Sequence, residues 1–269
     1  MKFKLFMFSH ENNGMWKNSF LSEKMATLHY IKNGFTEDEI FNFHVEDIQE
    51  LIKSYPEHFI KTPWFYGLYL WKPYLFLKLM NTINYNDILI FSDIGSLTKG
   101  KIKKTLSKFL EKEDMFFWKE NIPMYKDCKR DLFYQLQVDY KKYKNYPLLR
   151  GCFWVIKKTE KTIFYMKEIF KNMSKIENVD QDVRIKNNPE GFVANHSYQS
   201  VSTLTLINLG FDFVTFFNNR EKFLNKNNDI ELLIHACRSI RSLSHFENAC
   251  KILNFNESEK QELSKFYIT

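Results

Sequence analysis

The chain has 269 residues, of which 44% are hydrophobic and 26% charged, with 8 glycines and 6 prolines; these proportions exclude collagenous, low-complexity and disordered proteins. Lysine and arginine (39) exceed aspartate and glutamate (32), and the formal charge of +7 favours nucleic acid, anionic lipid or phosphorylated small molecules as partners. The apolar runs are shorter than the ~18 residues of a membrane-spanning helix, and the first residues lack the apolar length of a secretory signal. We therefore expect a cytoplasmic globular protein.

The four cysteines lie far apart, at Cys128, Cys152, Cys237 and Cys250, and form no C-x-x-C pair. This spacing indicates neither a zinc knuckle nor a small disulfide scaffold. Free thiols fit a reducing compartment.

In chain order, the first part alternates short β-prone runs with helical patterns. We expect strands over Lys2–Phe8, Glu39–His44 and Asp87–Phe91, and helices over Asn18–Lys32, Asp47–Tyr55 and from Pro73 to about Asn81. Asn33-Gly34 supplies a C-terminal stop for the first helix, and Pro56 ends the second.

The second part continues the alternation. We expect a helix over Lys99–Lys112, strands over Met115–Trp118 and Gly151–Lys157, helices over Thr159–Met173 and Gln199–Leu209, and amphipathic helix from about Ile230 to the end. The lysines of Lys99–Lys112 occupy one face of a predicted helix and are explained by an ordinary solvated surface.

Strands that alternate with helices predict an α/β fold with a mostly parallel, mixed sheet flanked by helices. The sequence contains no internal repeat and no clear linker. We expect one continuous domain over residues 1–241 and a helical C-terminal extension over residues 242–269.

The end of the Asp87–Phe91 strand is the first candidate site. The strand is almost entirely apolar, the pattern of a strand buried on both faces, and it runs into Ser92-Asp93-Ile94-Gly95. Ligands bind outside the carboxyl ends of strands in open α/β sheets, where a carboxylate at Asp93 is suited to Mg²⁺ or Mn²⁺. The alternative is an Asx turn or helix cap, with Gly95 supplying a permissive backbone; on this motif alone the turn is the stronger interpretation.

An aromatic-rich segment, Trp64–Tyr74, is the second candidate site. Aromatic faces stack on sugar or base rings, and Lys72 within the segment is suited to a phosphate. The same run is also typical of a hydrophobic core. A lysine inside an apolar run needs either to extend to the solvent or to meet an anionic partner.

These two segments together resemble a family of bacterial and viral surface-polysaccharide glycosyltransferases with the GT-A fold. The resemblance is carried by Trp71-Lys72-Pro73 within Gly67–Tyr74, and by the aspartate-any-glycine spacing of Asp93 and Gly95. Leu68-Tyr69-Leu70 stands in place of the family's tyrosine-tryptophan pair, and Ile94 in place of its alanine.

Two weaker similarities extend the resemblance over roughly residues 2–241. His196-Ser197-Tyr198-Gln199-Ser200 is similar to the family's box of histidine, any residue or arginine, aspartate, glutamine and serine. Ile234–Arg238 is similar to its histidine- and arginine-rich end. Tyr198 stands where the box has aspartate, and a tyrosine with an ordinary pKa near 10 cannot serve as a carboxylate base.

The resemblance implies a GT-A-like fold, a nucleotide-sugar donor and a sugar acceptor. It implies a Mn²⁺ or Mg²⁺ cofactor held by Asp93, His196 and His235. Donor contacts are expected from Tyr69, Trp71, Lys72, Gly95, Gln199 and Arg238. Catalytic candidates are Asp93, Asp182 and Glu190, because the role of the missing aspartate would move to Asp180, Asp182 or Glu190. Each histidine also has a structural interpretation, since imidazole satisfies buried hydrogen bonds.

We therefore expect a metal-assisted glycosyltransferase that moves a sugar from a nucleotide-diphosphate sugar to a glycan or lipid-linked glycan in cell-surface polysaccharide synthesis. The alternative is a catalytically impaired, transferase-like protein that binds nucleotide sugar or glycan without turnover. Nucleic-acid binding is not expected, because no recognisable nucleic-acid-binding motif supports it. A cytoplasmic enzyme of this class is expected at the inner face of the membrane, where Lys99–Lys112 or the C-terminal helices would contact anionic lipid.

Overall fold

A six-stranded mixed sheet forms the centre of the computed structural model, which describes residues 1–10, 18–60, 66–95, 97–180, 188–211, 214–217, 230–233 and 243–267. Its strands are β1 (Phe3–Phe8), β2 (Ile40–Phe43), β3 (Ile88–Ser92), β5 (Met115–Pro123), β6 (Pro147–Lys157) and β7 (Val214–Phe217), in the order β2-β1-β3-β6-β5-β7. Only β6 runs antiparallel to the other strands of this sheet. The predicted α/β fold with a mostly parallel, mixed sheet is confirmed.

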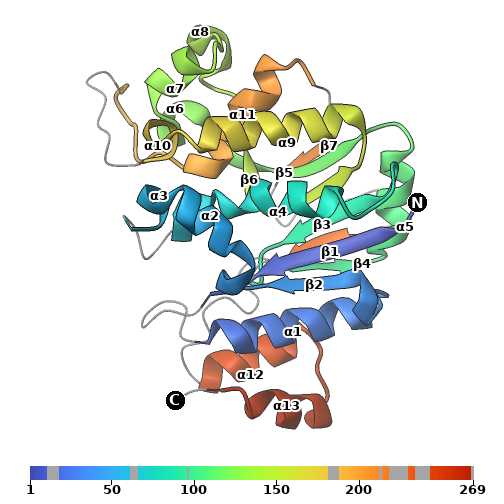
Figure 1. Ribbon diagram of the computed structural model, residues 1–269. Coiled ribbons are helices and arrows are strands. Elements are labelled where there is room, and N and C mark those ends of the chain that lie inside the picture. Colours follow the sequence, from blue (N-terminus) through green and yellow to red (C-terminus); the bar gives the residue numbers. More distant parts are fainter. Residues whose placement is uncertain are drawn as a thin grey trace.

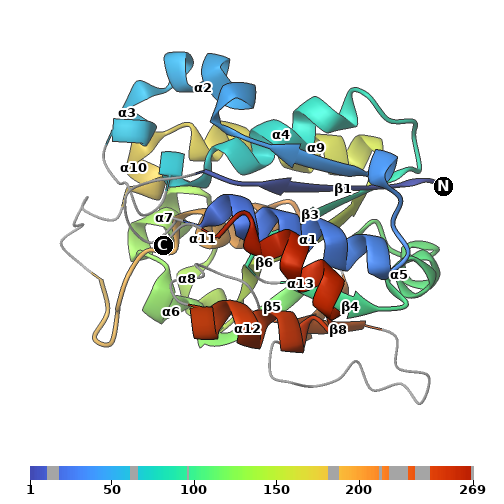
Figure 2. The same cartoon turned by 90° about the horizontal axis from the view of Figure 1, so that it is seen from below.

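Helices cover both faces of the sheet (Figure 1). The helices are α1 (Ser19–Lys32), α2 (Gln49–Ser54), α3 (Pro56–Ile60), α4 (Trp71–Met80), α5 (Ile102–Leu110), α6 (Met124–Asp127), α7 (Arg130–Gln135), α8 (Tyr140–Tyr143), α9 (Glu160–Met173), α10 (Ile176–Val179), α11 (Ser197–Asn208), α12 (Leu243–Ile252) and α13 (Glu257–Ser264), with 3₁₀ turns η1 (Glu37–Glu39), η2 (Val45–Ile48) and η3 (Tyr66–Tyr69). Helices α4 and α9 lie on one side of the sheet, and α1, α12 and α13 on the other (Figures 1 and 2).

The strand sequences explain why two helical layers are needed. Successive side chains of a strand point to opposite faces of a sheet. In β3, Leu89 and Phe91 join the core under α4 and α9, whereas Ile88 and Ile90 join the core under α1 and α5. All five residues of β3 are buried. The prediction that this strand is buried on both faces is confirmed.

Local stop signals set the helix ends much as predicted. Helix α1 ends at Lys32, Asn33 is its C-cap residue, and Gly34 follows with φ +91°. Pro56 begins α3 directly after α2 has ended, and Pro73 lies in the first turn of α4. The Thr159 hydroxyl caps α9 by accepting a hydrogen bond from the Thr162 amide at 3.2 Å.

Two predicted helical segments begin as strands instead. β4 (Leu97–Gly100) takes the first residues predicted for the helix of Lys99–Lys112, and β8 (Ile230–Leu233) takes the start of the predicted C-terminal helix. These two strands pair antiparallel with each other. Gly100, with φ +107°, then separates β4 from α5. The prediction was wrong here because the pairing joins segments remote in sequence, and helical periodicity does not report such pairing.

The C-terminal residues are helical beyond the part that is not described. α12 and α13 bury Phe246, Cys250 and Leu263 in the same core cluster as α1 and β3. The division into residues 1–241 and 242–269 stays a prediction. Within the described residues, no helix is long and apolar enough to cross a membrane.

A buried hydroxyl on α1 ties that helix to the end of β3. The Tyr30 hydroxyl lies 2.6 Å from Ser92 Oγ and accepts a hydrogen bond from the Thr98 amide at 3.1 Å. Burial raises the pKa of Tyr30 well above its ordinary value, so the phenol stays neutral and can donate to Ser92. Tyr30 thereby holds the backbone on both sides of Asp93.

We predict that Tyr30→Phe lowers the free energy of unfolding by about 1–3 kcal/mol, because it leaves a buried amide and a buried hydroxyl without their partner. Urea unfolding measures the loss. The matched control is Tyr85→Phe, since the Tyr85 hydroxyl also donates a hydrogen bond, to Glu160, but its ring is 53% exposed. The control should change stability by less than about 0.5 kcal/mol. Equal effects of the two variants would contradict the role given to Tyr30.

The turn η3, which leads into α4, has an unusual backbone. Gly67, Leu68 and Tyr69 all have positive φ, at 59°, 47° and 64°. A Cβ atom on Gly67 would lie 2.3 Å from a ring carbon of Phe59. Glycine is therefore favoured at this position, both for its backbone angle and for the space occupied by the Phe59 ring.

We expect Gly67→Ala to lower the free energy of unfolding by about 2–4 kcal/mol, from backbone strain and steric overlap together. Gly34→Ala is the control, because Gly34 also has positive φ but a Cβ atom on it would meet no atom within 4 Å. The control should lose only about 1–2 kcal/mol. Chemical denaturation of both variants gives the comparison, and a similar loss in both would show that Phe59 simply moves aside.

Candidate functional site

The strand order places a topological switch point between β1 and β3. From β1 the chain crosses through α1 to β2 on one side, and then returns through α4 to β3 on the other side of β1. The two crossover helices lie on opposite faces of the sheet (Figure 1). In open α/β sheets the crevice outside the carboxyl ends of such strands binds ligands. The residues at this point are His10, after β1, and Asp93, after β3.

Asp93 lies where the sequence predicted a site. Its amide donates a hydrogen bond to the Cys152 carbonyl of β6 at 2.8 Å, which fixes the backbone. Its Oδ1 accepts a long hydrogen bond, 3.4 Å, from the Gly95 amide, and this is the only hydrogen bond of the carboxylate within the described residues. Asp93 is half-buried. The turn interpretation and the ligand interpretation are thus compatible, because one carboxylate oxygen serves the turn and the other is left for a ligand.

His10 lies at this switch point and was not among the site residues predicted from the sequence. Its ring stacks on Tyr66, with centroids 4.7 Å apart. Burial lowers the pKa of His10 to about 4, although the Asp93 carboxylate favours the protonated form. At neutral pH the imidazole is therefore uncharged, the form that can ligate a metal or accept a hydrogen bond. The signal in the sequence was its place directly after the first strand.

Aromatic rings line the same end of β1. Phe8 stacks on Trp71, with centroids 4.2 Å apart. The Trp71 indole donates a hydrogen bond to the Tyr66 carbonyl at 3.0 Å, and Tyr69 lies 6.3 Å from Trp71, centroid to centroid. The candidate donor contacts Tyr69 and Trp71 are therefore brought together with His10 and Tyr66.

Lys72 is buried, with only 5% of its surface exposed. Its Nζ donates a hydrogen bond to the Gly151 carbonyl of β6 at 2.8 Å. Four ring centroids lie 4.5–5.4 Å from Nζ: those of Tyr69, Trp71, Phe91 and Tyr198. Carbonyl and ring contacts of this kind stabilise a buried ammonium group. The expected contact of Lys72 with a donor phosphate stays a prediction.

The His196–Ser200 segment meets the aromatic-rich segment at Gly151. The Gln199 amide donates to the Leu149 carbonyl at 3.2 Å, and a Cβ on Gly151 would lie 3.4 Å from Gln199 Cγ and 3.6 Å from Lys72 Nζ. Tyr198, which stands where the resembled box has aspartate, packs its buried ring with its centroid 4.7 Å from that of Trp154. The structure thus brings Lys72, Tyr198 and Gln199 together, although they are remote in sequence.

The other predicted site residues are scattered or not described. His196 Nδ1 lies 3.8 Å from a carboxylate oxygen of the buried Asp127. Glu190 is exposed in a turn. Asp182, His235 and Arg238 fall outside the described residues, and their expected roles stay predictions.

Asp180, a further candidate for the missing carboxylate, is buried beside Lys129. The Lys129 amine donates hydrogen bonds to the backbone carbonyls of Glu177 and Asp180. Burial lowers the pKa of Lys129, and the Asp180 charge opposes this shift. Through its backbone carbonyl, Asp180 thus helps to join the end of α10 to the segment after α6.

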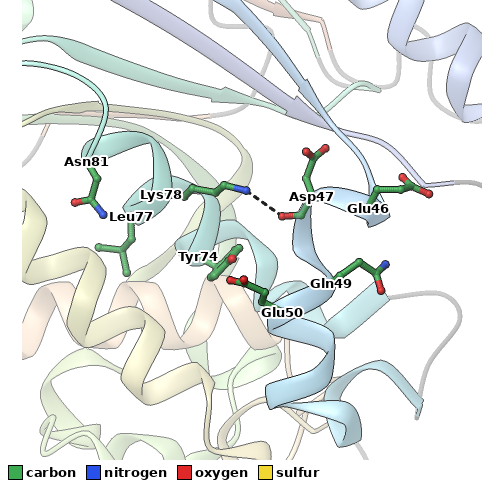
Figure 3. A pocket seen from close by; sticks show the side chains of 8 residues that line it. All are labelled: Glu46, Asp47, Gln49, Glu50, Tyr74, Leu77, Lys78 and Asn81. Carbon is green, nitrogen blue, oxygen red and sulfur yellow. Dashed lines mark hydrogen bonds between the residues drawn. The ribbon is translucent and has the colours of Figure 1, made fainter.

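A separate groove of about 670 Å³ lies between η2, α2 and α4 (Figure 3). Its carboxylates are Glu46, Asp47 and Glu50, and Lys78 donates a hydrogen bond to the Asp47 carbonyl at 3.1 Å. Tyr74, the last residue of the aromatic-rich segment, also lines this groove, but none of the residues given a catalytic, donor-binding or metal role does. In the part of the chain that the structure describes, no three His, Cys, Asp or Glu residues are grouped so as to hold a metal.

The sequence matches no protein-family model and no curated protein. In fold, the chain is similar to the WbbM bifunctional glycosyltransferase in its apo structure, with a TM-score of 0.51 and 10% sequence identity. The similarity covers 100% of this chain and 52% of that one, so the chain spans about half the length of that protein.

Two further solved structures are similar at lower TM-scores. Mouse xyloside xylosyltransferase 1 has a TM-score of 0.44 and 8% sequence identity, and the similarity covers 80% of this chain and 85% of that one. The galactosyltransferase LgtC, in complex with donor and acceptor sugar analogs, has a TM-score of 0.41 and 12% sequence identity. That similarity covers 80% of this chain and 73% of LgtC. The similarity to WbbM and the strand order show a GT-A-like α/β fold for this chain: an open mixed sheet between two helical layers.

Proposed function

We propose that this protein is a glycosyltransferase that moves a sugar from a nucleotide-diphosphate sugar to a glycan or lipid-linked glycan acceptor in surface-polysaccharide synthesis. The observation that carries the proposal is the place of Asp93: a half-buried carboxylate at the switch point of a GT-A-like sheet, whose charge acts on the uncharged His10. The fold similarity to a bifunctional glycosyltransferase supports the reaction class.

The donor set at this point fits a hard divalent cation, Mg²⁺ or Mn²⁺. Such a cation is commonly bound through one or two carboxylates, with substrate phosphates and water completing its shell. Asp93 offers a carboxylate oxygen, and His10 offers a neutral imidazole nitrogen, which Mn²⁺ tolerates better than Mg²⁺. When bound, the cation would neutralise charge on the departing diphosphate.

The residues of the chain supply binding and orientation. Tyr66, which is partly exposed, offers ring surface at the end of β1 for a base or sugar ring, and the buried Trp71 supports this end of the strand by stacking on Phe8. Lys72 holds Gly151 of β6, and thereby the strand against which Asp93 is fixed. Holding donor and acceptor in fixed geometry accounts for much of the acceleration in reactions of this kind.

Contact with an anionic membrane surface belongs to the same proposal. The exposed lysines of α5 and its flanks are Lys101, Lys104, Lys108 and Lys112. Clustered lysines attract anionic headgroups by about 1 kcal/mol each. α5 lies near the start of β1, at the end of the sheet away from Asp93 (Figures 1 and 2). A lipid-linked acceptor would therefore need to extend from the membrane to the opposite end of the sheet.

We predict that Asp93→Asn abolishes Mn²⁺-dependent stabilisation by nucleoside diphosphates and lowers sugar transfer at least about 100-fold. The variant keeps the oxygen that meets the Gly95 amide but removes the charge. A thermal-shift panel of nucleoside diphosphates and nucleotide sugars, with and without Mn²⁺, measures binding, because a ligand of the native state raises stability. Turnover is then assayed with the nucleotide that binds.

The control for this experiment is Asp38→Asn, at an exposed aspartate of η1. It should leave binding and turnover unchanged. Retention of the metal-dependent shift in Asp93→Asn would contradict the cation site. The lack of a shift with every nucleotide in the unmodified protein would contradict the proposed function, whereas binding without turnover would favour the impaired transferase.

The lowered pKa of His10 predicts acid sensitivity. In the unfolded chain an ordinary histidine protonates near pH 6.5, but His10 in the folded protein protonates only near pH 4. Between these values the unfolded state binds more protons, so stability falls as the pH falls. We expect His10 to lower the free energy of unfolding by about 2 kcal/mol at pH 4.5 relative to pH 7.5.

His10→Phe tests this prediction, because a phenyl ring can keep the stack on Tyr66. Urea unfolding of both proteins is compared at pH 7.5 and 4.5 with EDTA present. Carboxylates titrate in both proteins, so the difference between them isolates His10. The variant should lose about 2 kcal/mol less on acidification; an equal loss in both proteins would refute the neutral, buried histidine.

A further inference from the structure

A second groove, of about 370 Å³, lies between α7 and α8. Arg130, Tyr134, Gln137, Tyr140 and Lys141 are among the residues that line it. In both views α7 and α8 lie toward the end of the sheet at which β1 ends, the end that carries Asp93 (Figures 1 and 2). None of the motifs singled out in the sequence contributes to this groove.

Arg130 is held in place by two tyrosines. Its guanidinium carbon lies 5.0 Å from the ring centroid of Tyr140 and 5.9 Å from that of Tyr134. Its Nε donates a hydrogen bond to the Tyr134 hydroxyl at 3.2 Å. Within the described residues, no carboxylate lies within 4.0 Å of this guanidinium. The planar group is therefore oriented by rings and keeps its capacity to bind an anion.

The rest of the groove combines ring surface with positive charge. Tyr134 is 58% exposed, and Tyr140 is supported from behind by Phe133, with centroids 5.1 Å apart. Lys141 is exposed. Asp139 is the carboxylate of this groove, and its Oδ1 is occupied by the backbone amides of Lys141, at 2.8 Å, and Lys142, at 3.3 Å.

We propose that this groove binds an anionic sugar of the acceptor glycan: a pyranose ring against the tyrosines, with its carboxylate or phosphate on Arg130. Aromatic faces favour the apolar face of a sugar ring, and the guanidinium fork matches both acidic groups. This inference rests on the proposed function, to which it adds the chemical class of the acceptor.

The placement of the groove agrees with an acceptor subsite. β5 and β6 are joined through α6, α7 and α8, and the Tyr146 carbonyl, just before β6, accepts a hydrogen bond from the Met124 amide at 2.9 Å. β5 runs in the same direction as β3, so its carboxyl end lies at the edge that carries Asp93. Donor and acceptor sites at one edge of the sheet can serve a single transfer.

The test uses the full chain and three probes: methyl β-glucuronide, glucose 6-phosphate and the neutral methyl β-glucoside. Binding is measured by titration in ligand-observed NMR. We expect the anionic sugars to bind more tightly than the glucoside. Arg130→Gln should lower the affinity for the anionic sugars about tenfold and leave the affinity for the glucoside unchanged. Arg130→Lys should restore only part of the affinity, because an ammonium group lacks the planar fork. The preference between glucuronide and phosphate identifies the acidic group.

Lys142→Gln is the matched control, since Lys142 is an exposed lysine of α8 outside the groove lining. It removes the same charge and should leave all three affinities unchanged. Tyr134→Ala should lower the affinity for all three probes, including the glucoside, because each would stack its sugar ring on this tyrosine. An equal loss in Arg130→Gln and Lys142→Gln would overturn the site in favour of general attraction to a basic protein.

Nucleoside-diphosphate stabilisation is measured on the same variants to separate this inference from the proposed function. Unchanged nucleotide binding in Arg130→Gln, with loss of the anionic sugars, supports an acceptor subsite. Nucleotide binding without any Arg130-dependent sugar binding overturns the subsite and leaves the proposed function standing. Arg130-dependent sugar binding in a protein that binds no nucleotide overturns the acceptor role.

Discussion

Two neighbouring carbonyl groups of β6 join the parts of the candidate site. The Gly151 carbonyl accepts a hydrogen bond from Lys72, and the Cys152 carbonyl accepts one from the Asp93 amide. Lys72 on α4 and Asp93 after β3 are therefore positioned relative to each other by the same strand. β6 is the antiparallel strand of the sheet, and its register with β3, Ser92 opposite Phe153, decides where both motifs lie.

The buried ammonium of Lys72 is the most demanding part of this arrangement. Removing such a charge from water costs several kcal/mol unless polar or ring contacts replace the water. A carbonyl and four rings do so here. One of these rings belongs to Tyr198, the residue that stands in place of the aspartate in the resembled box. In this chain the position therefore stabilises a cation through a π face, and burial raises the pKa of Tyr198 well above its ordinary value.

The sequence predicted what local patterns encode. The apolar run of β3 and the Asn33-Gly34 stop are signals within a few residues, and both were confirmed. The β4–β8 pairing and the contact of Lys72 with Gly151 join segments remote in sequence, so periodicity did not reveal them. His10 was missed for the same reason: its importance comes from the switch point, which depends on the order of the strands and not on their composition.

The geometry of β6 also bears on the size of the acceptor. The strand begins at Pro147, shortly after α8, and reaches Gly151 four residues later. At 3.3 Å per residue this is about 13 Å along the strand. A single sugar ring is shorter than this stretch, so one sugar in the groove between α7 and α8 would not reach a donor at Asp93 if the two sites are separated by the length of the stretch. If both sites act together, the acceptor is an oligosaccharide whose acidic unit binds at Arg130 while a different unit, nearer its end, receives the new sugar. Such a division would let one charged residue select the chain without touching the reacting centre.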